Sequence, residues 1–536
     1  MRKSHESTLE RSGAARVRAL LVFTVTVVLY VPILGGTFTY DTRAQVLAEN
    51  FISRWENVAD VVSLRVLGMD VIDRGRPFHL LSMMLDARLW GLNPFGYHLT
   101  NVVLHALCAG LLYLFLLDVL GRALCDRQER SAERTGRIAE AGALIGALVF
   151  AAHPVNSEVV CEISYREDLL AVLFLLAALN LGRGFGGRAT IKPVARAAAC
   201  CVCVALSAGS KESGFVTPFL LAATWHMFRR KENPRIWAAL LLSSFALTGA
   251  FAAVRWAMAP RVSEVFRPVS SYPGGSFLGM LAVQPRLWVF QIQHVLLPLG
   301  LNPDYGPYSV RYISLPAALA VLAGVGAAVV LLRRRIVTLV PGVVLCAVAL
   351  LPVSNFVPIY KPLADRYLYM PMLGLCMIAG EVGGGMVTAA GGRIRTAART
   401  AVGGLLVVLT VLTLQREWVW RDRVRLWEDA CRKNPYSAPA WNNLGFARLE
   451  KGNHGGAIAA WRQCLEVTQG KYADAWAGLA IGLAATGSRA EAQQAYEHAL
   501  ALDERYGDTN SLARLRFWEA RDIRRLEEAV GLRPKE

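Results

Sequence analysis

The sequence has few charged residues: Asp, Glu, Lys and Arg fill 18% of its 536 positions, whereas 54% are hydrophobic. A soluble protein carries roughly 25% charged residues, so a purely soluble domain is excluded. The sequence also lacks a disulfide framework and a metal-ligand cluster. Its ten cysteines are scattered, and Cys200, Cys201 and Cys203 have no histidine at ligand spacing. We therefore predict neither a bound metal nor a cofactor.

The charge that is present is mainly basic, with 58 Lys and Arg against 41 Asp and Glu. The arginines lie beside the ends of long apolar segments, as they do in the cytoplasmic loops of membrane proteins. A nucleic-acid-binding protein would gather them on one face or stripe. The charge pattern therefore indicates membrane topology, and we predict no nucleic-acid partner.

Apolar segments close to membrane-spanning length recur along the chain. A span needs about 20 mostly apolar residues, and shorter segments can be completed inside a helical bundle. The eleven candidate spans are 17–36, 98–120, 138–152, 167–182, 196–209, 214–228, 236–258, 313–332, 336–353, 369–387 and 401–415. The segment 284–300 carries several Gln, Arg and His side chains. We predict that it lies at the outer interface or re-enters there without crossing.

Basic segments set the predicted orientation. They are the N-terminus, 121–137, 183–196, 229–235, 333–335 and 393–399. All fall on one side of the membrane if the N-terminus is cytoplasmic, which agrees with the positive-inside bias. Residues 1–16 are then a cytoplasmic tail before an uncleaved anchor, and residues 17–416 are a membrane domain. The predicted outer loops are 37–97, 153–166, 259–312 and 354–368.

The C-terminal part contains an internal repeat. A W-x2-L-G pattern that begins at Trp441 recurs 35 residues later at Trp476, with alanine in place of the glycine. This is the first-helix pattern of tetratricopeptide repeats. We predict repeats over 417–506, outside the cytoplasm, and a capping helix with a tail over 507–536. Stacked helix pairs form a concave surface, which predicts a groove for a peptide or protein partner.

Polar and charged groups gather in the predicted outer loops, where charge close to a membrane is costly and suggests function. In chain order the stretches are Phe38-Thr39-Tyr40-Asp41, Arg76-Pro77, Tyr97-His98-Leu99-Thr100-Asn101 with His105, His153-Pro154 with Glu158, Ser164-Tyr165-Arg166, Ser210-Lys211-Glu212-Ser213-Gly214 and Ala364-Asp365-Arg366-Tyr367. By the predicted topology they all lie on or near one face of the membrane. They therefore predict a single outer site.

This ordered set of motifs, followed by the repeats, resembles the TMTC-type (transmembrane and tetratricopeptide repeat) protein O-mannosyltransferases and their bacterial relatives over roughly residues 20–505. The resemblance implies an all-α fold, with a polytopic GT-C glycosyltransferase bundle followed by an α-solenoid. It implies a polyprenyl- or dolichyl-phosphate sugar donor, with mannose as the expected sugar. It also implies protein Ser or Thr acceptors bound through the repeat groove. We expect a multi-pass protein of a bacterial plasma membrane.

Inverting transfer needs a carboxylate to accept the hydroxyl proton and cations around the departing phosphate. Asp41 matches the family's base position, although Thr42 stands where the family usually has a second acid. Glu158 is the second predicted catalytic carboxylate. The predicted donor-phosphate ligands are Arg166, Lys211 and Arg366, and the supporting polar residues are His98, His105, His153, Asp365 and Tyr367.

Structural interpretations of the same residues stay open. Asp41 could cap a helix, and Lys211–Glu212 and Asp365–Arg366 could be local ion pairs. The histidines could be packed side chains with satisfied hydrogen bonds, or could end a helix before proline, as at position 153. Tyr367 could anchor the chain at the membrane interface.

Three other functions compete with transfer to protein. Transfer to a lipid or a glycan would use the same site, although the repeats favour a polypeptide. A transporter would place its charged groups near the bilayer midplane, within duplicated halves. A non-enzymatic scaffold that only anchors the repeats would need one span.

Overall fold

The computed structural model of the chain describes residues 2–48, 50–126, 131–183, 193–229, 232–258, 272–507, 524–525, 527–528 and 530. These residues form helices and connecting segments, and they contain no β-strand. This confirms the predicted all-α fold class. Most of the predicted capping helix and tail over 507–536, and part of the predicted outer loop 259–312, lie outside the described residues.

Each of the predicted spans overlaps a helix of the structure. The helices are α1 (Arg2–Tyr30), α5 (Pro94–Cys125), α6 (Ala132–Ala152), α8 (Arg166–Leu181), α9 (Pro193–Ser210), α10 (Thr217–Phe228), α11 (Pro234–Met258), α13 (Leu315–Leu332), α14 (Leu339–Leu350), α15 (Met372–Val387) and α16 (Gly392–Trp420). Seven of them are long and apolar enough to cross a membrane: α1, α5, α6, α9, α11, α13 and α16. The other four have only 12 or 16 residues. The membrane bundle is thus confirmed, and by length and composition seven of its helices qualify as spans.

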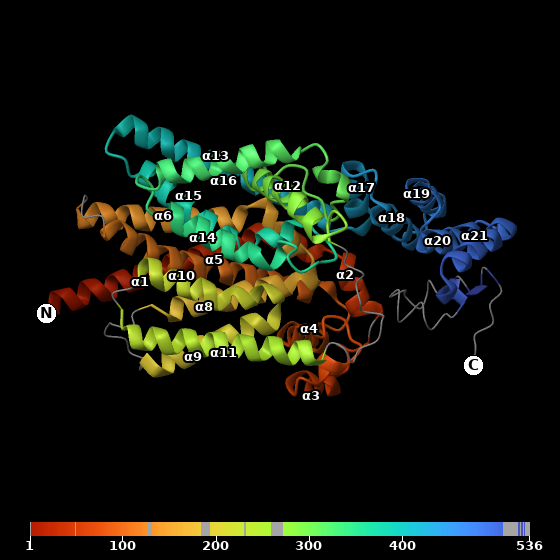
Figure 1. The fold of residues 1–536 in the computed structure, drawn as a ribbon, viewed down its shortest axis with the longest axis horizontal. Coiled ribbons are helices and arrows are strands. Elements are labelled where there is room, and N and C mark those ends of the chain that lie inside the picture. Colours follow the sequence, from red (N-terminus) through yellow and green to blue (C-terminus); the bar gives the residue numbers. More distant parts are fainter. Residues whose placement is uncertain are drawn as a thin grey trace.

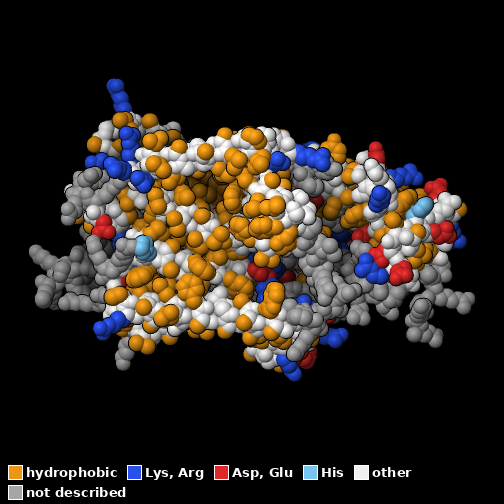
Figure 2. Space-filling view, viewed as in Figure 1, with side chains coloured by type: hydrophobic (Ala, Val, Ile, Leu, Met, Phe, Trp, Pro, Cys, Tyr) orange, Lys and Arg blue, Asp and Glu red, His pale blue; other side chains and the backbone are white. Residues whose placement is uncertain are grey.

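The bundle helices run along the long axis of the molecule, with the N-terminus at one end and the C-terminal repeats at the other (Figure 1). The short helices α2 (Tyr40–Arg43), α3 (Val58–Val62) and α4 (Pro77–Trp90) lie at the repeat end. Hydrophobic side chains cover the middle of the bundle, and Lys and Arg side chains gather at the end where α1 begins (Figure 2). Which side of the membrane this end faces stays a prediction.

The ambiguous polar segment belongs to α12 (Phe277–Leu296), a helix with Pro285 inside it. It is not among the helices whose length and composition allow a crossing. Its polar side chains Gln284, Gln291 and His294 are buried against the rest of the protein. The imidazole of His153 reaches α12, with 3.0 Å between its Nε2 and the carbonyl oxygen of Val295.

Close backbone contact between α6 and α15 depends on glycine. A Cβ added at Gly142 would lie 2.5 Å from the carbonyl oxygen of Gly380, and one added at Gly380 would lie 2.6 Å from that of Gly142. Small residues at such a crossing let two membrane helices approach through van der Waals packing. These glycines therefore allow α6 and α15 to pack closely against each other.

We expect Gly142→Ala to lower the melting temperature in detergent, because the new methyl group forces the two helices apart. Overpacking of this kind costs about 1–3 kcal/mol. Gly136 is the matched control in the same helix, since nothing lies within 4 Å of a Cβ at that position. Gly136→Ala should raise the melting temperature slightly through helix propensity. An equal effect of both substitutions would contradict the proposed helix crossing.

The repeats are stacked helix pairs. They consist of α17 (Arg423–Lys433), α18 (Ala438–Glu450), α19 (His454–Val467), α20 (Ala473–Ala485) and α21 (Arg489–Leu502). Trp461 is fully buried between the pairs, and a Cβ at Gly445 or Gly478 would meet its ring at 2.5 or 2.4 Å. The small residues at these positions of the repeat pattern thus make room for one large aromatic side chain.

Candidate active site

Asp41 lies on a tight turn just after α1. The chain leaves α1 through a short 3-10 helix, Val31–Gly35, and then begins α2 at Tyr40. Tyr40 has a φ of +40°, an uncommon conformation for a residue other than glycine, and such strain often marks functional sites. The Asp41 side chain is exposed, and its Oδ2 accepts a hydrogen bond from the Tyr165 hydroxyl at 3.0 Å.

Glu162 fixes the turn around Asp41 through hydrogen bonds. Its carboxylate is fully buried and accepts hydrogen bonds from the Thr39 hydroxyl (2.7 Å), the Thr42 amide (2.9 Å), the Ser164 hydroxyl (3.0 Å) and the Thr42 hydroxyl. Burial raises the pKa of Glu162 to about 7, and the nearby charge of Asp41 raises it further against the hydrogen bonds that lower it. Glu162 is thus a positioning group for the Asp41 turn.

Two cavities meet at Asp41. The larger has a volume of about 900 Å³ and lies between the Asp41 turn, the segments around Asp304 and Lys361, and the repeat helices. The smaller has about 220 Å³ and is lined by Asp41, Tyr165 and a charged group around Arg76. Asp41 therefore lines both spaces, one shared with the repeats and one within the membrane domain.

The first repeat helices are fixed to the membrane domain at the larger cavity. Asp304 accepts a hydrogen bond from the Ser437 hydroxyl, and its carbonyl oxygen accepts one from the Asn434 side chain at 3.2 Å. The ammonium group of Lys433 donates to the carbonyl oxygen of Leu301 at 2.8 Å. These contacts set the position of the repeat groove relative to Asp41.

Lys361 joins the two walls of the larger cavity. Its ammonium group donates to Asp304 at 2.8 Å and lies 4.7 Å from the centre of the Tyr40 ring, whose hydroxyl it also contacts. The ring of Tyr40 in turn packs on Trp427 of α17, with 5.1 Å between centroids. The strained turn is thus supported from the repeat side as well as by Glu162.

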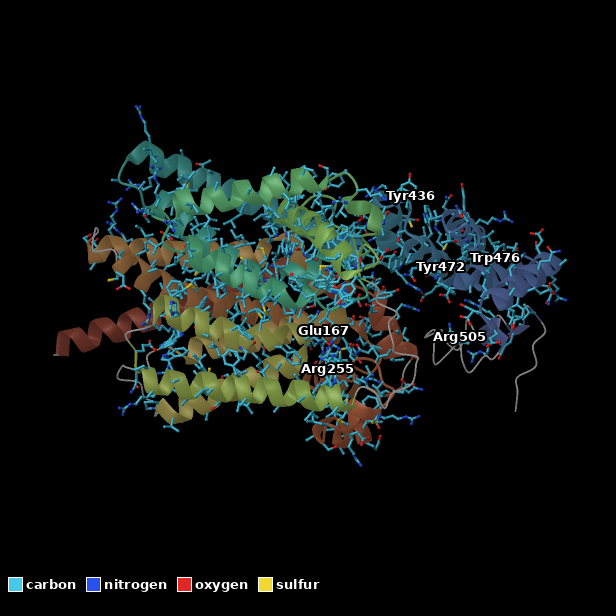
Figure 3. The ribbon with its side chains drawn as sticks, in the orientation of Figure 1. Glu167, Arg255, Tyr436, Tyr472, Trp476 and Arg505 are labelled. Carbon is cyan, nitrogen blue, oxygen red and sulfur yellow. The ribbon has the colours of Figure 1, made fainter. Side chains whose placement is uncertain are left out.

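The smaller cavity is lined by an ion network. Arg76 pairs with Asp73 at 2.5 Å, with Glu212 at 3.0 Å and with Glu167. Glu212 of this network also pairs with Arg255 of α11, and Figure 3 labels Arg255 and Glu167 toward the end of the bundle that faces the repeats. Burial raises the pKa of Asp73 to about 7, although Arg76 opposes the shift. Asp73, Glu167 and His79 bring potential metal ligands within 4.8 Å of one another, but the guanidinium of Arg76 already supplies positive charge between the two carboxylates.

Of the predicted site residues, Glu158 and Arg366 form a pair beside Asp41. The Glu158 carboxylate accepts from the Arg366 guanidinium at 2.7 Å and from the Arg366 backbone amide at 3.1 Å. The guanidinium lies over the ring of Tyr165, 4.3 Å from its centre, and lines the larger cavity. Tyr165 therefore links the Asp41 carboxylate to the Arg366 cation.

Arg166 and Lys211 are buried and engaged in ion pairs. The Arg166 guanidinium pairs with Asp86 at 2.5 Å and donates to Asn101 at 2.8 Å and to the carbonyl oxygen of Tyr97 at 3.0 Å. Lys211 pairs with Asp168 and, at 2.9 Å, with Glu167. Neither residue lines either cavity. Their contacts are those of groups that hold the membrane domain together, and their phosphate role stays a prediction.

We expect Arg166→Met to destabilise the fold by about 3–5 kcal/mol, because it leaves the Asp86 carboxylate buried without its partner. Adding Asp86→Asn should recover part of the loss, since no unpaired charge is then buried. Thermal unfolding in detergent measures both variants. Normal stability of Arg166→Met, together with a raised KM for the donor lipid, would instead assign Arg166 to the phosphate.

The supporting polar residues are packed inside the protein, outside the linings of both cavities. The His105 ring contacts the Tyr369 hydroxyl at 2.8 Å, and His98 packs beneath Gly36. The Asp365 carboxylate accepts from the Tyr305 hydroxyl at 2.7 Å, and the Tyr367 hydroxyl donates to the carbonyl oxygen of Lys361 at 2.8 Å. None of His98, His105, His153, Asp365 and Tyr367 lines either of these two cavities.

The sequence interpretation missed the groups that support the Asp41 turn. Glu162 stands four residues after Glu158 and could have been noticed as a second acid in the same outer loop. Lys361 and Asp304 had no comparable signal, because they lie in loops without a motif. Tyr165 belongs to one of the polar motifs, but the motif does not indicate its contact with Asp41.

Curated relatives align with most of the chain. The human protein O-mannosyl-transferase TMTC4 is 27% identical over 430 residues, covering 72% of this chain and 56% of the relative. Mouse TMTC3 is 23% identical over 431 residues, covering 73% and 44%. The protein O-mannosyl-transferase F38B6.6 of Caenorhabditis elegans is 22% identical over 458 residues, covering 82% and 61%.

The chain spans about half the length of the curated relatives it matches. No family model and no solved structure matches it. The names of these relatives nevertheless agree with the family that the sequence motifs indicate. They also agree with the observed combination of membrane helices and repeats. The chain is therefore similar to the TMTC-named protein O-mannosyl-transferases over most of its length.

Proposed function

We propose that the chain is an inverting glycosyltransferase that moves one sugar from a polyprenyl- or dolichyl-phosphate carrier to Ser or Thr hydroxyls of proteins on the outer side of the membrane. The expected sugar is mannose, because the curated relatives are named protein O-mannosyl-transferases. The expected location is a bacterial plasma membrane, with the repeats outside.

One observation carries the proposal: the exposed carboxylate of Asp41 lies where the two cavities meet. A transferase for two substrates needs a base that reaches the acceptor hydroxyl while the donor sugar lies on its other side. The larger cavity opens between the membrane domain and the repeats and suits a polypeptide. The smaller, at about 220 Å³, lies below the roughly 300–1,000 Å³ of sites for drug-sized ligands, which suits a single sugar.

In the proposed step, Asp41 accepts the proton of the acceptor hydroxyl as its oxygen attacks the anomeric carbon of the sugar. The bond between that carbon and the phosphate oxygen breaks, and the lipid phosphate leaves with the electron pair. Arg366 in the larger cavity and Arg76 in the smaller are cations available for the departing charge. No metal or cofactor takes part in the proposal.

Two features favour this function over its competitors. Transfer to a lipid or glycan would leave the attachment of the repeats to the cavity wall without a purpose. A scaffold would not need a buried carboxylate, Glu162, to hold a strained turn beside a cavity. A protein acceptor uses both features.

The direct test is an assay of the purified protein in lipid nanodiscs with radiolabelled polyprenyl-phosphate mannose and a Ser/Thr peptide. We expect label on the peptide hydroxyl, with inversion at the anomeric carbon. Assays with polyprenyl-phosphate glucose, and with a lipid or glycan acceptor in place of the peptide, separate the alternatives. Label on a lipid acceptor alone would assign the second function, and the absence of transfer from every donor would reject the enzymatic proposal.

A further inference from the structure

The first complete repeat turns one face of α18 toward the larger cavity. Pro439, Asn442 and Phe446 are spaced by three and four residues, so they share one side of the helix. All three line the cavity, together with the neighbouring Asn443. This stripe and Asp41 line the same cavity.

Asn442 is an unusual member of this face. The residue is only 7% exposed, and its side-chain Oδ1 has no hydrogen-bond partner among the described residues. Buried polar atoms in folded proteins almost always have a partner, and leaving one without costs free energy. A buried amide oxygen without a partner in a cavity wall therefore indicates a donor that arrives with a ligand.

The chemistry of a carboxamide narrows the class of ligand. It offers one acceptor and two donors, which match the N–H and C=O groups of a single residue in a polypeptide. The cavity walls carry charges of both signs, such as Asp474 and Arg423, so they do not select a polyanion. Tyr436 and Tyr472 add aromatic surface from the repeats (Figure 3).

We propose that the larger cavity binds the acceptor as an extended main chain, with the Asn442 side chain paired to the N–H and C=O of one acceptor residue. The proposal deepens the proposed function and rests on it. Only an extended segment offers these groups, because in a helix they are bonded within the chain. Recognition then depends on acceptor conformation more than on its side chains.

The attachment of the repeats to the membrane domain fixes the position of Asn442 relative to Asp41. Asp304 holds Ser437 and Asn434, which precede α18 by a few residues. The Asn442 amide therefore stands at a constant distance from the Asp41 carboxylate. The paired acceptor residue lies a set number of positions from the modified hydroxyl, and on one side of it only.

The test is a backbone scan of a single-serine peptide, read by binding to the full-length Asp41→Asn variant in nanodiscs. Each peptide carries one ester in place of one amide, which removes a single N–H donor. We expect the Kd to rise about tenfold for an ester at one position on one side of the serine, and to change little at its neighbours, whose groups point the other way.

Two variants of the protein complete the test. Asn442→Asp keeps the shape of the side chain but removes its N–H donors, and we expect weaker binding of the all-amide peptide. Gln493→Ala changes an exposed amide on α21, outside the cavity, and should leave the position dependence intact. A flat scan with the Asn442 side chain present, or unchanged binding to Asn442→Asp, would overturn the proposal.

The outcomes separate this inference from the function on which it rests. If the unmodified protein transfers sugar to the peptide but the ester scan is flat, the enzyme stands and extended main-chain recognition is wrong. If a position-dependent scan is found with no transfer from any donor, the groove binds polypeptide as inferred and the enzymatic proposal fails.

Discussion

Asp41→Asn should lower the kcat for sugar transfer by about 10²–10⁴-fold, the range typical of a general base. Asparagine has the same shape and can still accept the hydrogen bond from Tyr165, but it cannot take a proton from the acceptor hydroxyl. The side chain is exposed, so we expect the melting temperature and donor binding to change little.

Label transfer from a radiolabelled lipid-phosphate sugar to a peptide measures this effect. Asp60→Asn is a suitable control, because Asp60 also lies near the surface of the predicted first outer loop but pairs with Arg65 at 2.8 Å, outside both cavities. It should retain full activity. A folded Asp41→Asn variant with undiminished transfer would show that Asp41 is not the base.

Glu162→Gln should lower transfer by about 10- to 100-fold and also lower the melting temperature. The buried carboxylate accepts hydrogen bonds at both oxygens from Thr39, Thr42 and Ser164. A glutamine turns one acceptor into a donor, which leaves at least one of these groups without a partner at a cost of about 1–3 kcal/mol. The Asp41 turn then loses its fixed position.

Thr42→Ser serves as the control, since it keeps the hydroxyl that bonds to Glu162. We expect it to stay active. If Glu162→Gln folded less stably but transferred sugar at the normal rate, Glu162 would support the fold without positioning Asp41.

The same carboxylate predicts a pH dependence. Burial raises the pKa of Glu162 to about 7, and its ionised form accepts all the hydrogen bonds of the turn. Activity should therefore rise as the pH passes upward through about 7. Stability should change in the opposite direction. The folded state binds the Glu162 proton more tightly than the unfolded state does. The stability that this proton contributes is therefore complete below the ordinary glutamate pKa of about 4.3 and is lost by about pH 7.

Profiles of kcat/KM and of the melting temperature, from about pH 5 to about pH 8.5, test both directions. Glu162→Gln should flatten the rise near pH 7 in the kcat/KM profile and the decline toward pH 7 in the melting-temperature profile. An unchanged step in the variant would assign the titration to another group, of which Asp73 is the nearest candidate, because burial also raises its pKa to about 7.

The sequence predicted the helices well because apolar run length and repeat spacing are local signals. The predicted spans and the repeat at Trp441 and Trp476 correspond to helices of the structure. The paired glycines at the α6–α15 crossing were not predicted, because only the geometry of two distant segments shows that a Cβ would not fit there. Where the shorter bundle helices begin and end was also hard to predict, because it depends on the helices that pack against them.

The site was predicted less completely, for a physical reason. Motif residues such as Glu158 and Arg366 do lie beside Asp41, but a motif does not tell whether a charged group faces a cavity or an ion pair. Arg166 faces Asp86 in the interior. Lys361 reaches Tyr40 across more than 300 positions of sequence, and no local pattern could have joined them.

The most direct measurement is a cryo-electron microscopy structure of the Asp41→Asn variant in nanodiscs with a lipid-phosphate sugar and a serine peptide bound. The sugar should occupy the smaller cavity, and the serine oxygen should lie about 3 Å from the side chain at position 41. A sugar bound away from this side chain, or a peptide that does not enter the space between the repeats and the bundle, would contradict the account.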